Sequence, residues 1–146
     1  MDMINKFDGD YAFLSNFYES PCKFEGDIYP TVEHAFQAAK TLDLDERKMI
    51  AKAGTPGQAK QMGRNVSLRA DWEDVKTEVM RECLISKFSH PVLKMKLLAT
   101  GEEELIEGNY WHDTCWGVCN CAKCGDKGEN RLGKLLMEVR TLYRGY

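Results

Sequence analysis

The stretch TVEHAFQAAKTL, residues 31–42, is the segment from which the rest of the chain can be interpreted. Pro30 and Thr31 predict where its helix begins, because threonine is a good N-cap and proline is tolerated at a helix entrance. At about 100° per residue, one face of this helix is apolar. That face consists of Val32, Ala35, Ala38, Ala39 and Leu42. Its small alanines indicate that another element packs closely against it.

The other face of the predicted helix carries a polar stripe. Glu33, Gln37 and Lys40 follow one another at i, i+4 and i+7, which aligns a carboxylate, an amide and an amine on one support. Glutamate, glutamine and lysine are good helix formers, so such a stripe is most often a solvated face. The alternative is a set of catalytic side chains.

Length and composition predict one globular domain over residues 1–146. Hydrophobic residues make up 43% and charged residues 29%, which is typical of a globular protein. No apolar run approaches the roughly 18 residues of a membrane span. The opening MDMINKFDGD lacks the apolar core of a secretory signal, so we expect a cytoplasmic protein without membrane contact. The net charge of −3 disfavours bulk attraction to nucleic acid.

The remaining segments predict an α+β fold, a single compact and mainly helical domain with a small β-sheet. Aromatic residues 11–18 are typical of a short strand that passes into a turn. Residues 22–29 predict a hairpin with its turn at Gly26. Further helices are expected over residues 46–53, 55–62, 71–88 and 91–98, and a last one capped by Asn130.

The irregular segment after residue 108 contains Trp111, Asp113 and Trp116. Tryptophans suit a pocket in which a planar ring stacks while the carboxylate acts on it, and loops often carry binding residues. The equally weighted alternative is that one tryptophan fills the core under the loop and Asp113 caps a turn.

Four of the six cysteines follow in the same segment. They are Cys115, Cys119, Cys121 and Cys124. Cys121 and Cys124 form the CxxC half of a zinc knuckle, with His112 nearby, but a second separate pair is missing. Cys119 and Cys121, one residue apart, would strain to join one tetrahedron. We therefore expect reduced thiols and no cofactor, with structural zinc on these four cysteines as the alternative.

Five segments together resemble the NADAR family of YbiA-like N-glycosidases. They are FLSNFYESP, YPTVEHAFQAAK, Gly63-Arg64, Trp111–Gly117 and GENRLGKLLMEVR. The resemblance implies a compact α+β domain and a hydrolase that cleaves the bond between ribose C1 and nitrogen. It implies a phosphorylated ribosylamine of riboflavin synthesis as the favoured substrate. The alternatives are removal of ADP-ribose from guanine in nucleic acid and a non-catalytic ADP-ribose-binding module.

The resemblance also implies roles for individual residues. Lys40 matches the lysine that forms a Schiff base with the opened ribose, and Glu33 and Asp113 match the family's acids. The substrate-binding set expected here comprises Asn16, Phe17, Tyr18, Gln37, Arg64, Trp111, Trp116 and Asn130. The cysteine-rich insertion between Trp116 and Asn130 departs from the family pattern and bears on substrate choice.

The chemistry expected of Lys40 depends on its protonation state. Cleaving an N-glycosidic bond develops positive charge on the ribose and needs a proton for the leaving nitrogen, which a carboxylate can supply. A lysine can instead form an imine, provided that part of it is neutral. A lysine with an ordinary pKa near 10.4 is almost entirely charged at neutral pH, so the site must lower its pKa. Glu33 opposes this, because a nearby carboxylate favours the charged amine.

Overall fold

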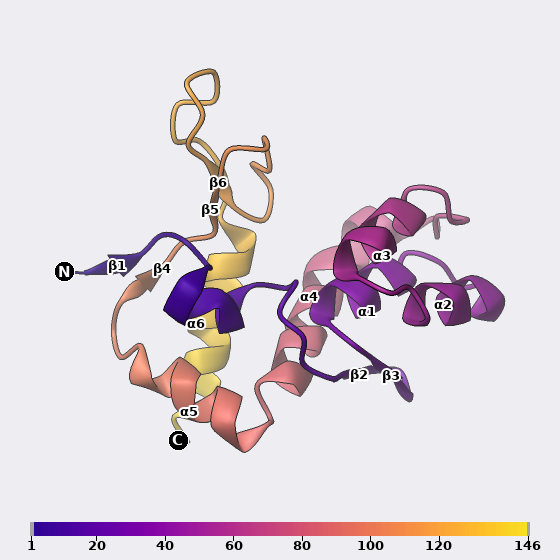
Figure 1. Cartoon of the computed structure of the whole chain (residues 1–146), viewed down its shortest axis with the longest axis horizontal. Coiled ribbons are helices and arrows are strands. Elements are labelled where there is room, and N and C mark those ends of the chain that lie inside the picture. Colours follow the sequence, from indigo (N-terminus) through magenta and orange to yellow (C-terminus); the bar gives the residue numbers. More distant parts are fainter. Residues whose placement is uncertain (1, 146) are drawn as a thin grey trace. The chain divides into compact units, whose positions relative to one another are not determined.

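The computed structural model describes residues 2–145. Within them, the chain separates into two compact units (Figure 1). Unit 1 comprises residues 2–15 and 90–145, and unit 2 comprises residues 16–89. Among the described helices, none is both long and apolar enough to cross a membrane.

Unit 2 begins with a hairpin of β2 (Cys22–Phe24) and β3 (Asp27–Tyr29), as predicted. The strands are antiparallel, with Cys22 opposite Tyr29. Glu25 and Gly26 form the turn, with φ of 48° and 89°. Glycine adopts the positive φ of the second position at little cost.

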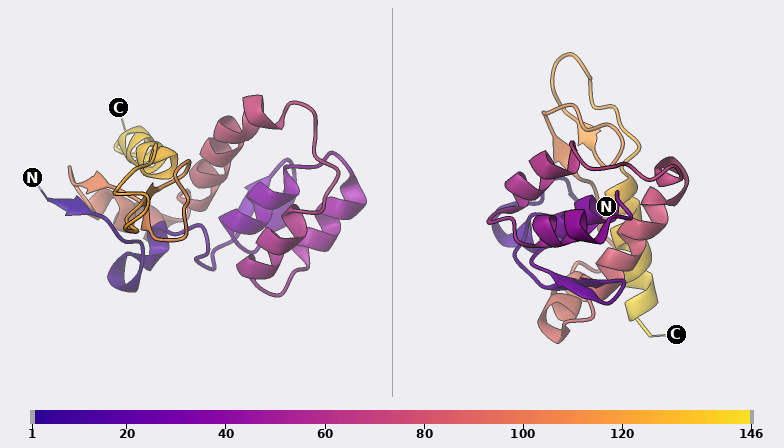
Figure 2. Two further views of the ribbon diagram at one scale, coloured as in Figure 1. Left: turned by 90° about the horizontal axis from the view of Figure 1, so that it is seen from above. Right: turned by 90° about the vertical axis from the view of Figure 1, so that its right-hand side faces the viewer.

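The helices of unit 2 surround α1 (Val32–Ala38), which packs against α2 (Leu44–Ala51), α3 (Pro56–Gly63) and α4 (Trp72–Lys87). Figures 1 and 2 show α1, α2 and α3 side by side within this unit. Every residue of α1 is buried, which explains the small alanines of its sequence.

The predicted helix over residues 31–42 is too long. Thr31 is the N-cap, and its side chain accepts the His34 N–H at 3.1 Å, but the helix ends at Ala38. Beyond it, the Lys40 carbonyl accepts the Arg69 N–H at 2.8 Å and Thr41 forms a bridge with Leu68. These contacts with a distant segment replace further helical turns, so Lys40 lies outside the helix that carries Glu33.

Unit 1 combines two small parallel sheets with helices. Strand β1 (Met3–Ile4) pairs with β4 (Glu104–Leu105), and β5 (Gly108–Asn109) pairs with β6 (Val118–Cys119). The helices are α5 (Pro91–Ala99) and α6 (Arg131–Tyr143).

The strand expected within residues 11–18 is wrong. Residues Gly9–Leu14 form the 3-10 helix η1, in which the Tyr11 N–H donates to Asp8 O at 2.9 Å. Phe13 and Leu14 are both buried, whereas a half-buried strand would alternate its exposure. Two adjacent apolar residues fit a tight helical turn better.

The fold class is confirmed as α+β and mainly helical. The strands of the described residues form three two-stranded sheets instead of one. The single domain over residues 1–146 stays a prediction.

Candidate functional site

The polar stripe of α1 is not a solvated face. The side chains of Glu33 and Gln37 are buried, with 8% and 4% of their surface exposed. Gln37 Nε2 donates a hydrogen bond to the Glu33 carboxylate at 2.6 Å, which fixes the carboxylate on the helix. His34 lies between them in sequence but is structural, since its ring contacts Thr31 Oγ1 at 2.8 Å and Ala53 O at 3.0 Å.

Helix α3 lies unusually close to Gln37. A Cβ at the buried Gly63 would lie 2.7 Å from Gln37 Cδ and closer still to its Oε1. Only glycine therefore fits at the end of α3 while the Gln37 amide keeps its place. The sequence motif Gly63-Arg64 thus has a packing explanation at its first residue.

Two buried carbonyl oxygens of unit 2 have no hydrogen-bond partner among the described residues. They are Gln37 Oε1 and Asn16 Oδ1. Both residues contact Glu33, because the Asn16 backbone carbonyl accepts the Glu33 N–H at 3.1 Å and the Gln37 amide donates to the carboxylate. An unsatisfied buried acceptor costs free energy, so these oxygens mark an incompletely satisfied polar region beside Glu33.

The pKa of the Lys40 amine is lowered below its ordinary value of 10.5. The largest cause is burial, which disfavours the charged form. Glu33 acts in the opposite direction and favours the ammonium, as expected from the sequence. Arg64, Lys60 and Lys76 lower the pKa further by charge repulsion. Burial and three cations thus outweigh one carboxylate and increase the neutral fraction of the amine.

The other predicted ligand residues of unit 2 differ in exposure. Phe17 is 44% exposed, and Arg64 is exposed and donates to Gln61 Oε1 at 3.1 Å. Tyr18 is half-buried, and its ring lies 5.6 Å from the Lys87 amine in a cation–π contact. Phe17 and Arg64 are therefore accessible to a ligand, whereas Tyr18 also supports a buried lysine.

In unit 1, Asp113 caps a turn. Its Oδ1 accepts the backbone N–H groups of Cys115 at 3.1 Å and Trp116 at 2.9 Å. The buried Asn109 holds the same residue by its backbone, since its side chain accepts the Asp113 N–H and donates to the Asp113 carbonyl. Asp113 is half-buried. The turn-capping alternative from the sequence is thus present, and a chemical role of this carboxylate stays a prediction.

The tryptophans of this loop are placed differently. Trp111 is 55% exposed and meets Tyr110 edge to face, with ring centroids 5.8 Å apart. Trp116 is half-buried. Asn130 precedes α6 but makes no side-chain cap; instead it accepts the Glu107 N–H and donates to Leu105 O, both at 3.0 Å. Its predicted substrate contact is not tested by these bonds.

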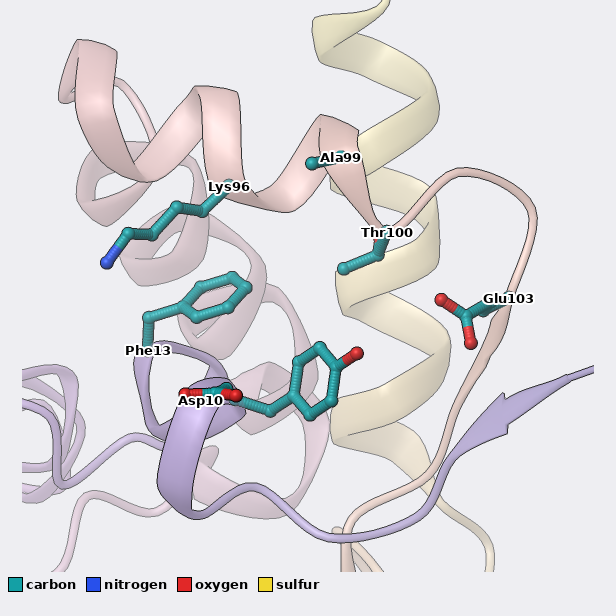
Figure 3. A pocket seen from close by; sticks show the side chains of 7 residues that line it. Asp10, Phe13, Lys96, Ala99, Thr100 and Glu103 are labelled. Atoms are coloured by element: carbon teal, nitrogen blue, oxygen red, sulfur yellow. The ribbon is translucent and has the colours of Figure 1, made fainter.

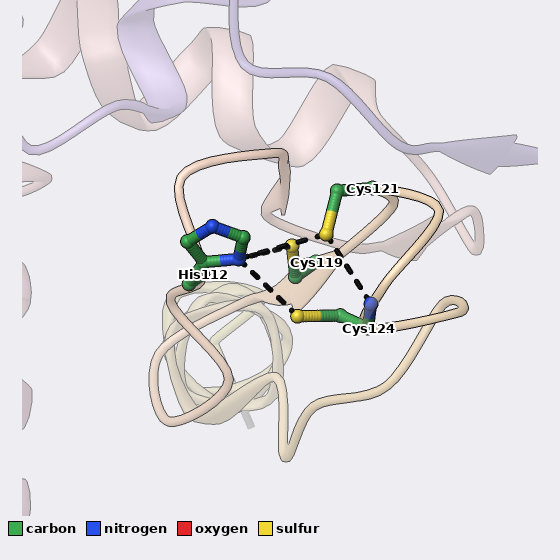
Figure 4. Close-up of side chains that lie close together, drawn as sticks. All are labelled: His112, Cys119, Cys121 and Cys124. Atoms are coloured by element: carbon green, nitrogen blue, oxygen red, sulfur yellow. Dashed lines mark hydrogen bonds between the residues drawn. The ribbon is translucent and has the colours of Figure 1, made fainter.

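The four cysteines that the sequence offered as an alternative zinc set do not all lie together. The side chains that gather are His112, Cys119, Cys121 and Cys124, whereas Cys115 is outside the group (Figure 4). Their ligand atoms all lie within 4.8 Å of one another. The expected strain between Cys119 and Cys121 does not keep them apart, because Cys119 is on β6 and the chain turns after it. This group could hold a metal ion.

The two described pockets contain none of the predicted site residues. One, of about 270 Å³, lies between η1 and α5 in unit 1 and is lined by Asp10, Phe13, Lys96 and Glu103 among others (Figure 3). The other, of about 160 Å³, lies beside the hairpin and α2 in unit 2. The candidate site is therefore defined by its buried polar groups and not by either of these two pockets.

Sequence reasoning missed several residues of these clusters. Lys60 and Lys76 influence Lys40 from α3 and α4, and Asn109 positions Asp113 from β5. None of them belongs to a motif, so only the fold could identify them. His112 was adjacent to the cysteines in sequence, and that proximity was the available signal for its place in the cluster.

The fold and the cluster around Lys40 define a small α+β protein with a half-buried lysine close to a buried carboxylate and its buried amide partner. The chain matches the NADAR domain over residues 4–144 and belongs to the NADAR family. This confirms the resemblance noted from the sequence.

Named relatives place the chain more closely. It is 46% identical over 134 residues to the N-glycosidase YbiA of Shigella flexneri serotype 5b, covering 90% of this chain and 81% of that protein. It is 36% identical over 137 residues to a riboflavin biosynthesis protein of Vibrio vulnificus, covering 91% of this chain and 36% of that protein. The NMR structure of the E. coli protein YbiA matches with a TM-score of 0.84 and 42% identity over 98% of this chain and 86% of that chain. The predicted enzyme class agrees with these names.

Proposed function

We propose that this chain is an N-glycosidase that hydrolyses the ribose C1–N bond of a phosphorylated ribosylamine, such as an intermediate of riboflavin synthesis. Family membership and the name of the Shigella flexneri relative support the reaction class. The riboflavin biosynthesis protein of Vibrio vulnificus supports the substrate class.

The observation that carries the proposal is the environment of Lys40. Its amine has a lowered pKa although Glu33 is one of its charge partners. A lowered pKa increases the neutral fraction of a lysine, and the neutral amine is the form that makes an imine. The unpartnered oxygens of Gln37 and Asn16 add acceptors for ribose hydroxyls.

The proposed reaction uses these groups in order. When the ribosylamine ring opens, C1 becomes the imine carbon of the leaving amine. The neutral Nζ of Lys40 adds to C1, its two protons pass to the leaving nitrogen with Glu33 as the proton carrier, and the C1–N bond breaks to leave a lysine imine. Water then adds to C1 of this imine, its two protons pass to Nζ, and the Nζ–C1 bond breaks, which releases the ribose aldehyde and the amine of Lys40.

Positive charge around Lys40 supports a phosphorylated substrate. Arg64, Lys60 and Lys76 all raise the local potential enough to lower the Lys40 pKa. The same cations would stabilise a phosphate group, and the exposed guanidinium of Arg64 can bind it with two hydrogen bonds. We assign Arg64 to the phosphate for this reason.

Replacement of Lys40 by Met tests the mechanism. We expect kcat/KM on a ribosylamine phosphate to fall by about 10²–10⁴-fold, the range of a lost acid–base or nucleophilic group, while the fold is retained. Lys48→Met, at an exposed lysine of α2, is the matched control and should keep full activity. Full activity in Lys40→Met would remove the mechanism.

Borohydride trapping separates two routes to the same products. An imine reduced in the presence of substrate leaves a stable ribosyl adduct on the peptide that contains Lys40. Its detection by mass spectrometry would support the imine, whereas substrate turnover without any adduct would favour carboxylate catalysis by Glu33.

The role of Asp113 is tested by Asp113→Asn. An asparagine Oδ1 can still accept the N–H groups of Cys115 and Trp116, so the turn is preserved while the charge is removed. A large loss of kcat with normal stability would assign chemistry to the carboxylate. Unchanged kcat would leave it as a turn cap.

A second candidate function follows from the exposed aromatic pair Tyr110 and Trp111. Exposed rings on a loop can stack with a nucleobase, as in proteins that bind single-stranded nucleic acid. This favours removal of ADP-ribose from guanine in nucleic acid as the alternative. Comparing base release from ribosylamine phosphates and from ADP-ribosylated oligonucleotides, by mass spectrometry, distinguishes the two substrates.

A further inference from the structure

The cluster of His112, Cys119, Cys121 and Cys124 has the composition of a tetrahedral Cys3His site. His112 Nδ1 lies 3.3 Å from Cys124 Sγ, 3.5 Å from Cys121 Sγ and 3.8 Å from Cys119 Sγ. With ordinary Zn–N and Zn–S bonds, the edge of a tetrahedron between nitrogen and sulfur is roughly 3.6 Å. The three nitrogen–sulfur distances are therefore close to those that a single ion imposes, and all four ligand atoms lie within 4.8 Å of one another.

We propose that these four side chains bind one Zn²⁺ ion and that the ion fastens the loop of residues 109–128. Three thiolates and one imidazole nitrogen are soft and borderline ligands, and their tetrahedral arrangement favours zinc over magnesium or calcium. Each thiol loses its proton to solvent when it binds, so the four ligands and the ion together carry one negative charge.

The surrounding loop is constructed to hold the ligands together. Cys119 is buried on β6 and donates its backbone N–H to Lys127 O at 2.8 Å, which closes the loop that contains Cys121 and Cys124. The Cys124 N–H donates to Cys121 Sγ at 3.2 Å, a contact that stabilises a thiolate. The sulfur atoms are thus oriented by the backbone toward His112 (Figure 4).

The site has a structural consequence for the neighbouring Asp113. His112 precedes Asp113 directly, and Asn109 on β5 bonds to Asp113 while β5 pairs with the strand that carries Cys119. The ion would fasten His112, which lies between Trp111 and Asp113, to the three cysteines that follow in the loop. The assignment of the metal does not depend on the proposed function, because its test measures zinc and not turnover.

Metal content tests the proposal. Protein purified without chelator and under reducing conditions should contain one zinc per chain, as measured by inductively coupled plasma mass spectrometry. Cys121→Ser and Cys124→Ser should lose it. The matched control is Cys115→Ser, which changes a cysteine of the same loop outside the cluster and should retain one zinc. Equal loss in Cys115→Ser, or no zinc in the wild type after reconstitution of reduced protein, would overturn the site.

Cobalt and proteolysis give independent measurements if a serine variant does not fold. Wild-type protein stripped with a chelator should bind one Co²⁺ and show the visible bands of a tetrahedral thiolate complex. Removing the metal should also accelerate tryptic cleavage after the exposed Lys123 and Lys127, roughly tenfold or more, because the loop opens locally. Absence of cobalt bands, or a cleavage rate unaffected by chelator, contradicts the proposal.

Discussion

Replacing Gly63 by Ala examines how closely α3 holds the Gln37 amide. The added Cβ would lie 2.7 Å from Gln37 Cδ and 3.1 Å from Gln37 Cβ. Gly63 has a helical backbone that alanine also adopts, so any penalty comes from this contact. Because α1 is buried along its whole length, the amide must rotate while the helix stays in place.

The expected cost follows from the hydrogen bond that the rotation breaks. A bond to a charged group such as the Glu33 carboxylate contributes about 1.5–3 kcal/mol. Alanine in place of a helical glycine returns about 0.5–1 kcal/mol. We therefore expect Gly63→Ala to lower the free energy of unfolding by about 1–2 kcal/mol. If Glu33 acts in catalysis, its loss of orientation should also lower kcat/KM by up to about 10²-fold.

Urea unfolding and steady-state kinetics measure the two effects. Gly57→Ala is the matched control, since Gly57 is an exposed glycine of the same helix whose added Cβ would meet only Thr55 Oγ1, at 3.8 Å. This variant should gain about 0.4–1 kcal/mol and keep its activity. The double variant Gly63→Ala/Gln37→Ala should lose little beyond Gln37→Ala alone, because the contacts with the amide are then absent and only the 3.1 Å approach of the two Cβ atoms remains.

The result that would refute the reasoning is a Gly63→Ala protein as stable and as active as Gly57→Ala. The Gln37 amide would then not be confined by α3, and its bond to Glu33 would not depend on the glycine. Additive losses in the double variant would lead to the same conclusion.

Three further predictions concern charge and burial. The pKa of Lys40 should fall in Glu33→Gln and rise in Arg64→Gln. It can be measured from the pH dependence of reductive alkylation of Lys40 by an aldehyde and cyanoborohydride, and shifts in the opposite directions would contradict the assigned causes. Burial lowers the pKa of Lys87 to about 7, so the unfolded chain binds this proton more tightly and the free energy of unfolding should rise from pH 7 toward 10.5. Lys87→Met should remove that rise, which is worth about 1.4 kcal/mol per pKa unit, when urea unfolding is measured at several pH values. An unchanged slope would exclude the buried amine as its source. Asn130→Ala should lose about 2–4 kcal/mol in the same assay, because the half-buried Glu107 N–H and the buried Leu105 carbonyl lose their bonds and alanine is strained at a φ of 52°. A loss below about 0.5 kcal/mol would show that these bonds do not matter.

Much of the fold follows from local sequence signals. Thr31 caps α1, Gly26 turns the hairpin, and Pro56 and Pro91 begin helices where the sequence predicts them. These signals work because capping and turn geometry depend on neighbouring residues only. The end of α1 depends instead on Arg69, almost thirty residues away, and the helical pattern through Leu42 contains no sign of it.

The candidate site shows the same division. The residue types Glu33, Gln37 and Lys40 could be named from a motif, but the burial of Glu33 and Gln37 and the half-buried position of Lys40 could not. Periodicity places them opposite an apolar face, where solvent is the usual environment. Glu33 and Gln37 are buried because α3 and α4 also cover α1, and Gly63 allows that approach. The tension between Glu33 and a neutral Lys40 is reduced by the same packing, which adds desolvation and cations from other helices.

The cysteine segment shows why spacing alone did not identify the fourth side chain of the cluster. Sequence distance made Cys115 equivalent to the other three, yet its backbone N–H is bound by Asp113 as part of a turn. That turn separates Cys115 from the cluster and leaves His112, on the other side of Asp113, to face the three sulfur atoms. The same short segment therefore determines both the position of the carboxylate and the membership of the cluster. Lys40 is positioned by the helices of unit 2, whereas Asp113 is positioned by the loop of unit 1. Changes in the cysteine-rich insertion can therefore alter the surroundings of Asp113 while the contacts that lower the Lys40 pKa are preserved.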